Sequence, residues 1–492
     1  MKNMPDGRGH QHIQVGRHPE VKALLEDIER VADGGSSVRF VIGSYGSGKT
    51  FFLHLVGSIA RERKLVTASA DLTPDRRLYS TGGHGRALYA ELMRNLATRA
   101  KPDGGALPSV VEKFVGSALT EARAEGVEPP AVIHRRLESL SEMVGGYDFA
   151  HVLECYWRGH EGGDEELKAA AVRWLRAEFA TRTDARKALG VRTIIDDATV
   201  YDSLKLMGRF LRLAGYGGLL VELDEMVNLY KMANGRARNS NYEQVLRILN
   251  DCLQGSAEGL GFVLSGTPEF LTDTRRGLFS YEALQSRLSE NSFARDGLVD
   301  FSGPVLRLAN LSPEDFFVLL RNLRHVQAGG VEEDYLLPDE GLQAFMDHCH
   351  QRIGEAYFRT PRNTIKGFVQ LLAVLEQNPG TSWEALVGDL RVDEDRNPDF
   401  EPLPEDAGGG GWGQRRAALR GVAEQGPAEV EPWGAEREPP AEEPEPVFAV
   451  ETHECPPGLP NCNEPDQASD TQEQQGQEAS AGQGQQGAQT QQ

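Results

Sequence analysis

The residues best suited to chemistry form a glycine-rich loop between two apolar segments. The loop has the pattern Gly-x-x-x-x-Gly-Lys-Thr and consists of Gly43, Ser44, Tyr45, Gly46, Ser47, Gly48, Lys49 and Thr50. In this pattern the glycines let consecutive backbone N–H groups point at phosphate oxygens. The lysine reaches the β- and γ-phosphates, and the threonine hydroxyl binds Mg²⁺. The loop therefore predicts a site for ATP and Mg²⁺, and we include the next residue, Phe51, among the nucleotide-binding residues.

The segments on both sides of the loop support this prediction. Residues 38–42 before it are apolar and rich in β-branched side chains, which is typical of a buried strand. After it, apolar residues recur at helical spacing and predict a helix that begins at about Lys49. The N-terminus of a helix carries a partial positive charge that favours phosphate. A strand, this loop and a helix in succession are the context in which the pattern binds nucleotide.

A second acidic motif follows another short apolar run. Residues 219–223 are apolar except for Glu222, and Asp224 and Glu225 come directly after them. In a nucleotide-hydrolysing protein Asp224 would hold Mg²⁺ through water, and Glu225 would orient and deprotonate the attacking water. An alternative is that Asp224 caps the N-terminus of a following helix. The glycine-rich loop in the same chain favours the first interpretation.

These motifs require an α/β core to bring them together. Strand-length apolar runs occur at residues 38–42, 65–70, 219–223, 260–264 and 304–308. Residues from 101 to about 200 contain no convincing strand and read as helices broken at Pro and Gly pairs, which indicates a helical insertion. We expect a five-stranded parallel sheet flanked by helices, with the ligand at the carboxyl ends of the strands.

Three parts of the chain differ in composition. Residues 13–308 are predicted to form the α/β nucleotide-binding domain, and residues 309–395 a helical lid that contains the capping box Ser312-Pro313-x-Asp315. Arg362 in this lid falls in the first turn of a predicted helix, where a cation costs roughly 0.3–1 kcal/mol unless an anion lies nearby. That anion is either a nucleotide phosphate or a local carboxylate. Residues 401–492, with 18 acidic and 4 basic side chains, are predicted to form a disordered acidic tail.

Composition also limits the class of protein. The net charge is -22, of which the tail carries about -14, so residues 1–400 carry about -8 and do not suggest a broad nucleic-acid-coating surface. The five cysteines include no Cys-x-x-Cys pair, which argues against a disulfide framework or a zinc site. No apolar run reaches 18 residues and no signal core begins the chain. We expect a cytoplasmic protein without a membrane-spanning segment.

The order of these motifs resembles that of an AAA+ ATPase, in the branch of origin-recognition initiators and signalling ATPases. More closely, the segments GSYGSGKTFFLHLV, VELDEMVNLY, GFVLSGTPEFL, YEALQSRL and FRTPRNT resemble the BrxD family of ATP-binding proteins from bacterial BREX phage-defence systems. The resemblance covers about residues 12–395. Initiators of this branch carry a winged-helix DNA-binding domain after the lid, whereas here the acidic tail follows, so DNA is only a candidate partner.

The resemblance implies roles for residues outside the two motifs. Val15, Gly16 and Arg17 would lie beside the adenine. Either Ser265 or Thr267, at the end of a predicted strand, would be the first sensor of the γ-phosphate, although a simple capped turn fits these residues equally well.

Two arginines receive roles in the same way. Arg287 would be the finger that reaches the γ-phosphate of a neighbouring subunit, unless it simply pairs with a local acid. Arg362 would be the second sensor and would move with the lid.

Together the motifs and the resemblance predict an ATP-hydrolysing switch in phage defence. The protein would bind ATP and Mg²⁺, assemble with itself or with other defence proteins, and change shape on hydrolysis. Two alternatives stay open. A nucleotide-gated scaffold would bind ATP and scarcely hydrolyse it, and a P-loop kinase would pass the phosphoryl group to a substrate. The position of Glu225 beside Asp224 favours water as the acceptor.

Overall fold

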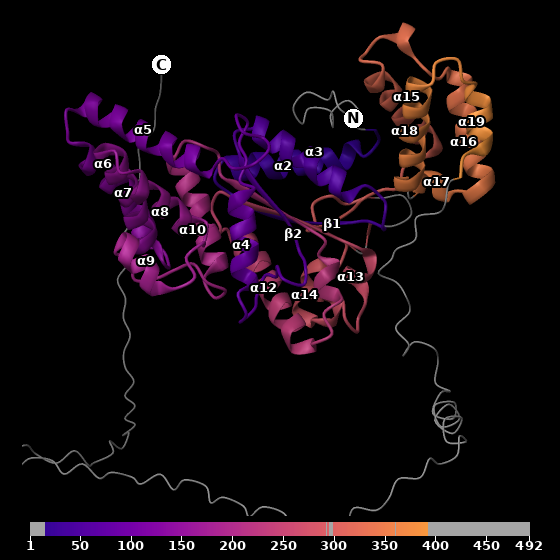
Figure 1. Cartoon of the computed structure of the whole chain (residues 1–492). Coiled ribbons are helices and arrows are strands. Elements are labelled where there is room, and N and C mark those ends of the chain that lie inside the picture. The colour runs from indigo at the N-terminus through magenta and orange to yellow at the C-terminus, as the bar shows by residue number, and fades with distance from the viewer. Residues whose placement is uncertain (1–14, 292, 295–298, 360, 392–492) are drawn as a thin grey trace, which may run out of the picture. The chain divides into compact units, whose positions relative to one another are not determined.

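The computed structural model describes residues 15–291, 293–294, 299–359 and 361–391 (Figure 1). Residues 13 and 14 of the predicted α/β domain, residues 392–395 of the predicted lid and the whole predicted acidic tail, 401–492, lie outside these residues.

A parallel sheet of five strands lies at the centre of the α/β part, as predicted. The strands are β1 (Ser36–Ile42), β2 (Val66–Asp71), β3 (Leu219–Asp224), β4 (Leu260–Gly266) and β5 (Val305–Arg307). Their order across the sheet is β2-β3-β4-β1-β5, and every neighbouring pair is parallel. The strand that enters the glycine-rich loop therefore lies in the interior of the sheet, next to β4.

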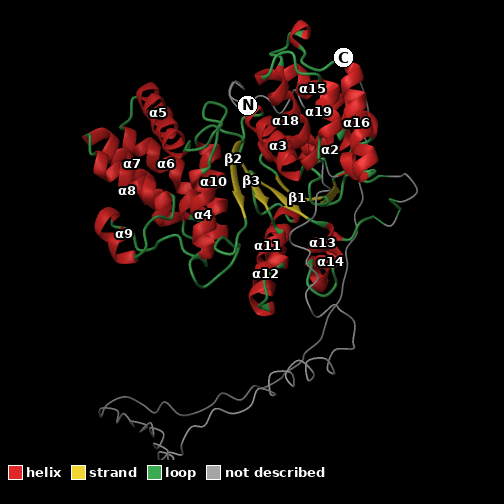
Figure 2. Ribbon diagram, turned by 45° about the vertical axis from the view of Figure 1, so that its right-hand side comes forward, coloured by secondary structure: helices red, strands yellow, loops and turns green. Residues whose placement is uncertain are grey.

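Helices cover both faces of this sheet. They are α2 (His18–Ala32), α3 (Lys49–Glu62), α4 (His84–Arg94), α10 (Val200–Leu213), α11 (Val227–Tyr230), α12 (Gly235–Leu253), α13 (Pro268–Thr272), the 3-10 helix η1 (Leu278–Ser280) and α14 (Glu282–Leu288). Alternate residues of β1 belong to different cores: Val41 packs with α2 and α3, and Phe40 packs with α4, α10 and α12. Figure 2 shows the strands enclosed between helices. Because both faces are covered, the strands appear in the sequence as continuous apolar runs.

The predicted insertion is helical. It consists of α5 (Leu107–Glu125), α6 (Pro129–Ser141), α7 (Gly146–Gly162), α8 (Glu165–Leu175) and α9 (Arg182–Leu189). Residues 107–189, all of them described, contain no strand. Edge-to-face ring contacts of Phe210 on α10 with Phe114 and Phe149, at centroid distances of 5.4 and 6.0 Å, join the insertion to the core of the α/β part. The insertion therefore supports α10, which leads directly into β3.

The segment after β5 is also helical, as predicted. It contains α15 (Pro313–Gln327), the 3-10 helix η2 (Glu332–Asp334), α16 (Asp339–Ile353), α17 (Ala356–Arg359), α18 (Arg362–Gln377) and α19 (Trp383–Asp389). The predicted capping box is present: Asp315 N donates to Ser312 Oγ, and Ser312 N donates to the Asp315 carboxylate. These helices share a separate apolar core built around Phe316, Phe345 and Phe368. The role of this segment as a lid stays a prediction.

None of the described helices is long and apolar enough to cross a membrane.

Candidate nucleotide-binding site

The glycine-rich loop forms a tight turn between β1 and α3. Gly46 and Gly48 have φ angles of +77° and +85°, a region in which only glycine is free of steric cost. A Cβ atom on Gly43 would lie 2.7 Å from Ser47 Oγ, so that position also needs glycine. The Ser47 hydroxyl is buried and has no hydrogen-bond partner among the described residues. The curvature and the uncommitted hydroxyl fit a loop that wraps phosphate.

Lys49 folds its side chain over this loop. Its Nζ donates hydrogen bonds of 3.0 Å to the carbonyl oxygens of Gly43 and Ser44, and it forms no ion pair within the described part of the chain. Burial lowers the pKa of Lys49, and the charges of Asp224 and Glu225 partly oppose that shift. A partly buried ammonium held only by neutral carbonyls is suited to a phosphate group.

A short hydrogen bond joins the loop to the acidic strand. Thr50 Oγ1 donates to Asp224 Oδ2 at 2.6 Å, although 174 positions separate the two residues. The other carboxylate oxygen of Asp224 accepts a hydrogen bond of 2.8 Å from Glu225 N. A hydroxyl and a carboxylate are the hard oxygen donors that Mg²⁺ prefers. Thr50 and Asp224 therefore fit the two metal-binding roles predicted for them.

Glu225 has a strained backbone and an uncommitted carboxylate. Its φ angle is +57°, which costs a non-glycine residue about 1–3 kcal/mol and is typical of functional sites. No described residue donates a hydrogen bond to its side chain. Burial and the charge of Asp224 raise the pKa of Glu225, against the opposing effect of Lys49. Because α11 begins after Met226 without a side-chain cap, the alternative of Asp224 as an N-cap is wrong.

Arg17 contacts the glycine-rich loop from the N-terminal end of the described chain. Its Nη2 donates to the carbonyl oxygen of Ser47 at 2.5 Å, and its Nε donates to that of Ala309 at 3.2 Å. Burial is the main cause that lowers the pKa of Arg17. Val15 packs against the core of the C-terminal helices, and Gly16 lies beside Asp315. The structure thus brings Arg17 to the loop, whereas Val15 and Gly16 lie against the C-terminal helices. The contact of all three residues with adenine stays a prediction.

Arg362 also reaches the loop. Its Nη1 donates to the Tyr45 hydroxyl at 2.8 Å, and its guanidinium lies 5.7 Å from the centre of the Tyr45 ring. Within the described ranges no carboxylate pairs with Arg362, which disfavours the local-carboxylate alternative. The first turn of α18 therefore presents a cation to the phosphate-binding loop.

The remaining predicted residues are less closely tied to the site. Ser265 lies on β4, and its buried Oγ lacks a partner among the described residues. Thr267 Oγ1 accepts a hydrogen bond from Phe270 N at 3.3 Å and so caps α13. Both residues stay candidates for the sensor. Arg287 is exposed on α14 and donates to the carbonyl of Ala283 in its own helix, so the structure does not bring it to the loop of the same chain.

Two acidic residues of the site were not predicted. Asp71 ends β2 directly opposite Asp224 in the strand pairing, and burial and the Asp224 charge raise the pKa of Asp71. Glu269, in the first turn of α13, acts electrostatically on Lys49. A signal for Asp71 was available, because an acid directly follows the predicted strand at residues 65–70. For Glu269 the sequence offered only its position two residues after Thr267, one of the two predicted sensor residues.

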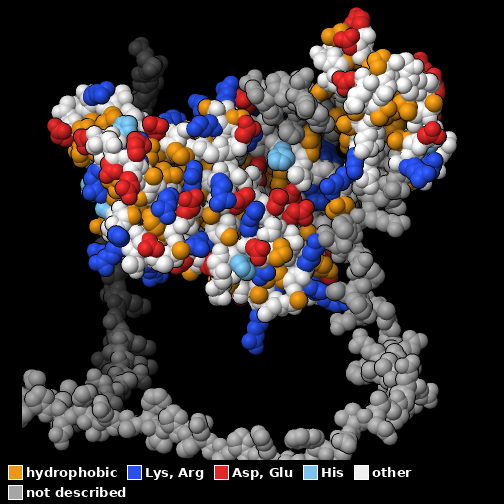
Figure 3. All heavy atoms as spheres, in the orientation of Figure 1, with side chains coloured by type: hydrophobic (Ala, Val, Ile, Leu, Met, Phe, Trp, Pro, Cys, Tyr) orange, Lys and Arg blue, Asp and Glu red, His pale blue; other side chains and the backbone are white. Residues whose placement is uncertain are grey.

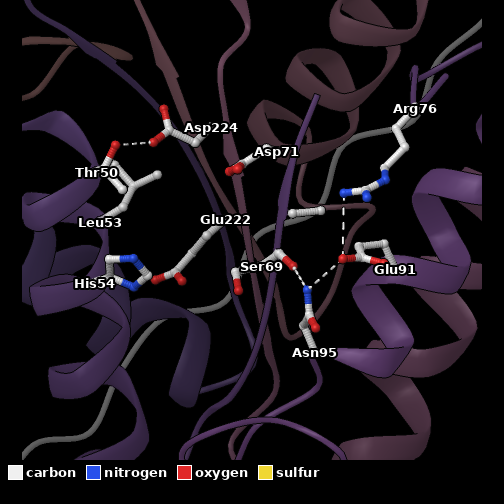
Figure 4. Close-up of a pocket in the computed structure, with 11 residues that line it drawn as sticks. Thr50, Leu53, His54, Ser69, Asp71, Arg76, Glu91, Asn95, Glu222 and Asp224 are labelled. Atoms are coloured by element: carbon white, nitrogen blue, oxygen red, sulfur yellow. Dashed lines mark hydrogen bonds and ion pairs between the residues drawn. The ribbon is translucent and has the colours of Figure 1, made fainter. Parts of the chain in front are cut away.

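A cavity of about 250 Å³ lies beside the Thr50–Asp224 pair, between α3, α4 and the strands β2 and β3 (Figure 4). Its walls include Asp71, Arg76, Glu91 and Glu222. Glu222 is only 4% exposed, its Oε1 has no partner within the described residues, and burial raises its pKa to about 8. The apolar run of β3 thus contains an acid that lies inside the protein.

A glycine of α3 makes room for this buried acid. A Cβ atom at Gly57 would lie 2.5 Å from Glu222 Oε1. We expect Gly57→Ala to lower the free energy of unfolding by about 1–3 kcal/mol, because the added methyl group would overlap the buried carboxyl group of Glu222. Gly116→Ala in α5, where nothing lies within 4 Å, is the control and should stabilise the helix by up to about 1 kcal/mol. Urea denaturation measures both, and equal effects would contradict this account.

The raised pKa of Glu222 predicts a pH-dependent stability. Its folded-state pKa of about 8 lies above the ordinary value of 4.5. At low pH the carboxyl group of Glu222 is protonated in both the folded and the unfolded protein. As the pH rises from 4.5 to 8 it ionises readily only in the unfolded protein, so the folded protein loses stability. In Mg²⁺-free protein, Glu222→Gln should gain about 2–4 kcal/mol over the wild type between pH 5 and pH 8. Denaturation curves at both pH values test this, with exposed Glu138→Gln as the control; a gain that does not depend on pH would refute it.

Comparison with known proteins identifies a family. A family model described as BREX system ATP-binding protein BrxC/D matches residues 5–391. No curated protein and no solved structure matches the chain.

Proposed function

The chain belongs to the family of BREX system ATP-binding proteins BrxC/D, and from this we propose that it is an ATP-hydrolysing switch of BREX defence. The family supports ATP binding in BREX defence. Hydrolysis, the use of Mg²⁺ and assembly with partners are the proposed steps beyond it.

The observation that carries the proposal is the hydrogen bond between Thr50 and Asp224, with the uncommitted carboxylate of Glu225 next to it. When bound, ATP with Mg²⁺ supplies a phosphoryl group whose charge is spread over the metal and its protein ligands. The amides of the loop and Lys49 bind and orient the phosphates. Glu225 positions a water molecule and accepts its proton, for which a raised pKa is favourable near neutral pH.

The contacts of two arginines suggest how the nucleotide state could be transmitted. Arg362 connects α18 to Tyr45, and Arg17 connects Ser47 to the segment before α15. A phosphate at the loop would compete with the neutral oxygens of Tyr45 and Ser47 for these cations, because hydrogen bonds to charged acceptors are stronger. Binding and loss of the γ-phosphate would then shift the C-terminal helices.

Measurement of phosphate release tests the proposal. We expect release from ATP in the presence of Mg²⁺, loss of release with EDTA, and loss of release in Asp224→Asn. The assay is repeated with DNA and with other BREX proteins, because these could be required for activity. No release under any condition would leave the nucleotide-gated scaffold, and phosphate transferred to a protein or small-molecule acceptor would leave the P-loop kinase.

Arg287 allows a test for a site shared between subunits. Because its side chain is exposed and, among the described residues, hydrogen-bonded only within α14, we propose that it acts on a neighbouring copy of the chain. Arg287→Ala and Glu225→Gln should each be inactive. A random mixture of the two should recover up to about a quarter of the wild-type activity, because about one subunit contact in four then combines an intact Glu225 with an intact Arg287. A mixture as inactive as its components would count against a shared site, provided that sedimentation shows mixed assemblies.

A further inference from the structure

Asp71 lies beside Asp224 at the carboxyl end of the sheet. The two residues are paired directly across the parallel strands β2 and β3. Neighbouring strands lie about 4.8 Å apart, and residues paired in this way point to the same face of the sheet. The carboxylates of Asp71 and Asp224 therefore lie close together on one face.

This face is the one covered by α3. Thr50 of α3 donates its hydrogen bond of 2.6 Å to Asp224 there. Thr67 is four residues before Asp71 and so lies on the same face of β2. Its Oγ1 accepts a hydrogen bond of 3.0 Å from Arg61 of α3. Asp71 therefore points to the side of the sheet from which Thr50 reaches Asp224.

Two hydrogen bonds hold the backbone beside Asp71 in place. Leu72 N donates to the carbonyl oxygen of Asp224 at 3.0 Å. Asn228 Nδ2 donates to the carbonyl oxygen of Leu72 at 2.8 Å. The chain that follows β2 is thus tied to β3 and to α11, and the position of the Asp71 carboxylate relative to Asp224 is set by the fold.

The Asp71 carboxylate is uncommitted. Within the described ranges it forms no ion pair and accepts no hydrogen bond. Arg76, which lines the same cavity, is paired instead with Glu91 at 3.5 Å. Asp71 is exposed to solvent, whereas Asp224 is only 6% exposed. Two adjacent carboxylates repel each other, and a cation between them and the solvent would relieve that repulsion.

The cavity beside these residues contains a further oxygen atom without a partner. Asp71, Asp224 and Glu222 all line the cavity (Figure 4). Glu222 is 4% exposed, and its Oε1 has no partner in the described part of the chain. Acceptors of this kind orient the water molecules and ligands around a metal ion. In Figure 3, acidic side chains lie on the face of the molecule between the positions that α3 and α4 have in Figure 1.

We propose that Asp71 joins Thr50 and Asp224 in holding a divalent cation of the Mg²⁺ class, and that the protein binds this cation before ATP. Two carboxylates and a hydroxyl are a hard, oxygen-only set of donors, and Mg²⁺ completes such a set with water.

The second carboxylate is what makes binding without nucleotide possible. With Thr50 and Asp224 alone, the phosphates of ATP would have to supply the remaining negative charge around the cation. Asp71 supplies that charge from the protein. The inference rests on the proposed function for the kind of cation, and it goes beyond that function by adding a residue to the site and an order of binding.

Cation binding to the nucleotide-free, full-length protein tests the proposal. The probe is Mn²⁺, which takes the same oxygen ligands as Mg²⁺ and whose EPR signal distinguishes the free from the bound ion. We expect the wild type to bind Mn²⁺ at a saturable site. Asp71→Asn keeps the size of the side chain but removes its charge, and it should bind Mn²⁺ about 10- to 100-fold more weakly. The matched control is Asp75→Asn, in the exposed loop that follows β2, which should bind like the wild type.

Thermal unfolding separates cation binding from a purely structural role of Asp71. Without a cation, Asp71→Asn should unfold at the wild-type temperature or above it, because the substitution removes a charge that repels Asp224. Loss of a contact that supports the fold would instead lower the unfolding temperature. Mn²⁺ should raise the unfolding temperature of the wild type and of Asp75→Asn, and should raise that of Asp71→Asn less.

The proposal is overturned if the wild type binds no Mn²⁺ without nucleotide, or if Asp71→Asn binds it as tightly as the wild type. It is also overturned if Glu222→Gln weakens binding and Asp71→Asn does not, because the cation would then lie deeper in the cavity. Phosphate release is not part of this readout. Mn²⁺ binding by a protein that does not hydrolyse ATP would leave this inference intact and refute the ATPase, and hydrolysis by a protein that takes up the cation only together with ATP would do the reverse.

Discussion

Replacement of Glu225 by glutamine is expected to slow ATP hydrolysis at least about a hundredfold while ATP binding stays intact. Glutamine has nearly the same size as glutamate and keeps the side chain beside Asp224, but it cannot accept a proton from water. The backbone of Glu225 is strained, with φ at +57°, and its carboxylate accepts no hydrogen bond from a described residue. Both features are expected of a group that is held ready for a reactant and does not support the fold.

The measurement combines single-turnover phosphate release with ATP binding by calorimetry. Exposed Glu243→Gln on α12 is the matched control and should change neither quantity. Near-normal turnover in Glu225→Gln would show that the base is misassigned, and Asp71 would then be tested next, because it lies opposite Asp224 at the same end of the sheet. Loss of ATP binding together with hydrolysis would instead indicate that Glu225 supports the loop.

The parts of the fold that could be predicted are those in which local sequence and tertiary structure agree. All five strands occur where apolar runs were found, because strands covered on both faces must be apolar along their whole length. The glycine-rich loop has a pattern set by its own backbone, which needs glycine at positions 46 and 48. The ligand end of the sheet then follows from the parallel arrangement of the strands.

The parts that could not be predicted depend on interactions between distant segments. The pairing of Asp71 with Asp224 requires the order of the strands, in which β2 is next to β3. Glu222 was recognised only as a break in an apolar run, since a sequence does not show that Gly57 leaves space for its carboxyl group. The role of Arg362 as the second sensor stays a prediction, and its hydrogen bond with Tyr45 follows only from the packed structure. The predicted role of Arg287 is a contact with the nucleotide of a second subunit, which the structure of a single chain cannot show.

Lys49→Ala is expected to have the largest effect on ligand binding, with ATP affinity reduced at least about a hundredfold. Hydrogen bonds to charged groups contribute about 1.5–3 kcal/mol each, so the loss of two such bonds to phosphate accounts for this factor. In the structure the same ammonium group donates to the carbonyls of Gly43 and Ser44. The substitution therefore also removes two hydrogen bonds that hold the loop closed, and the loop amides become less well preorganised for phosphate.

Calorimetry and thermal unfolding together separate these two effects. ATP should raise the unfolding temperature of the wild type and of the control Lys22→Ala, whose side chain is exposed on α2, but not that of Lys49→Ala. The unfolding temperature of Lys49→Ala without ATP measures only the effect of removing the two hydrogen bonds within the loop. Unchanged ATP affinity in a folded Lys49→Ala protein would mean that the loop amides and the two arginines, Arg17 and Arg362, suffice to hold the phosphates. The role of Lys49 as the side chain that binds the phosphates would then have to be revised.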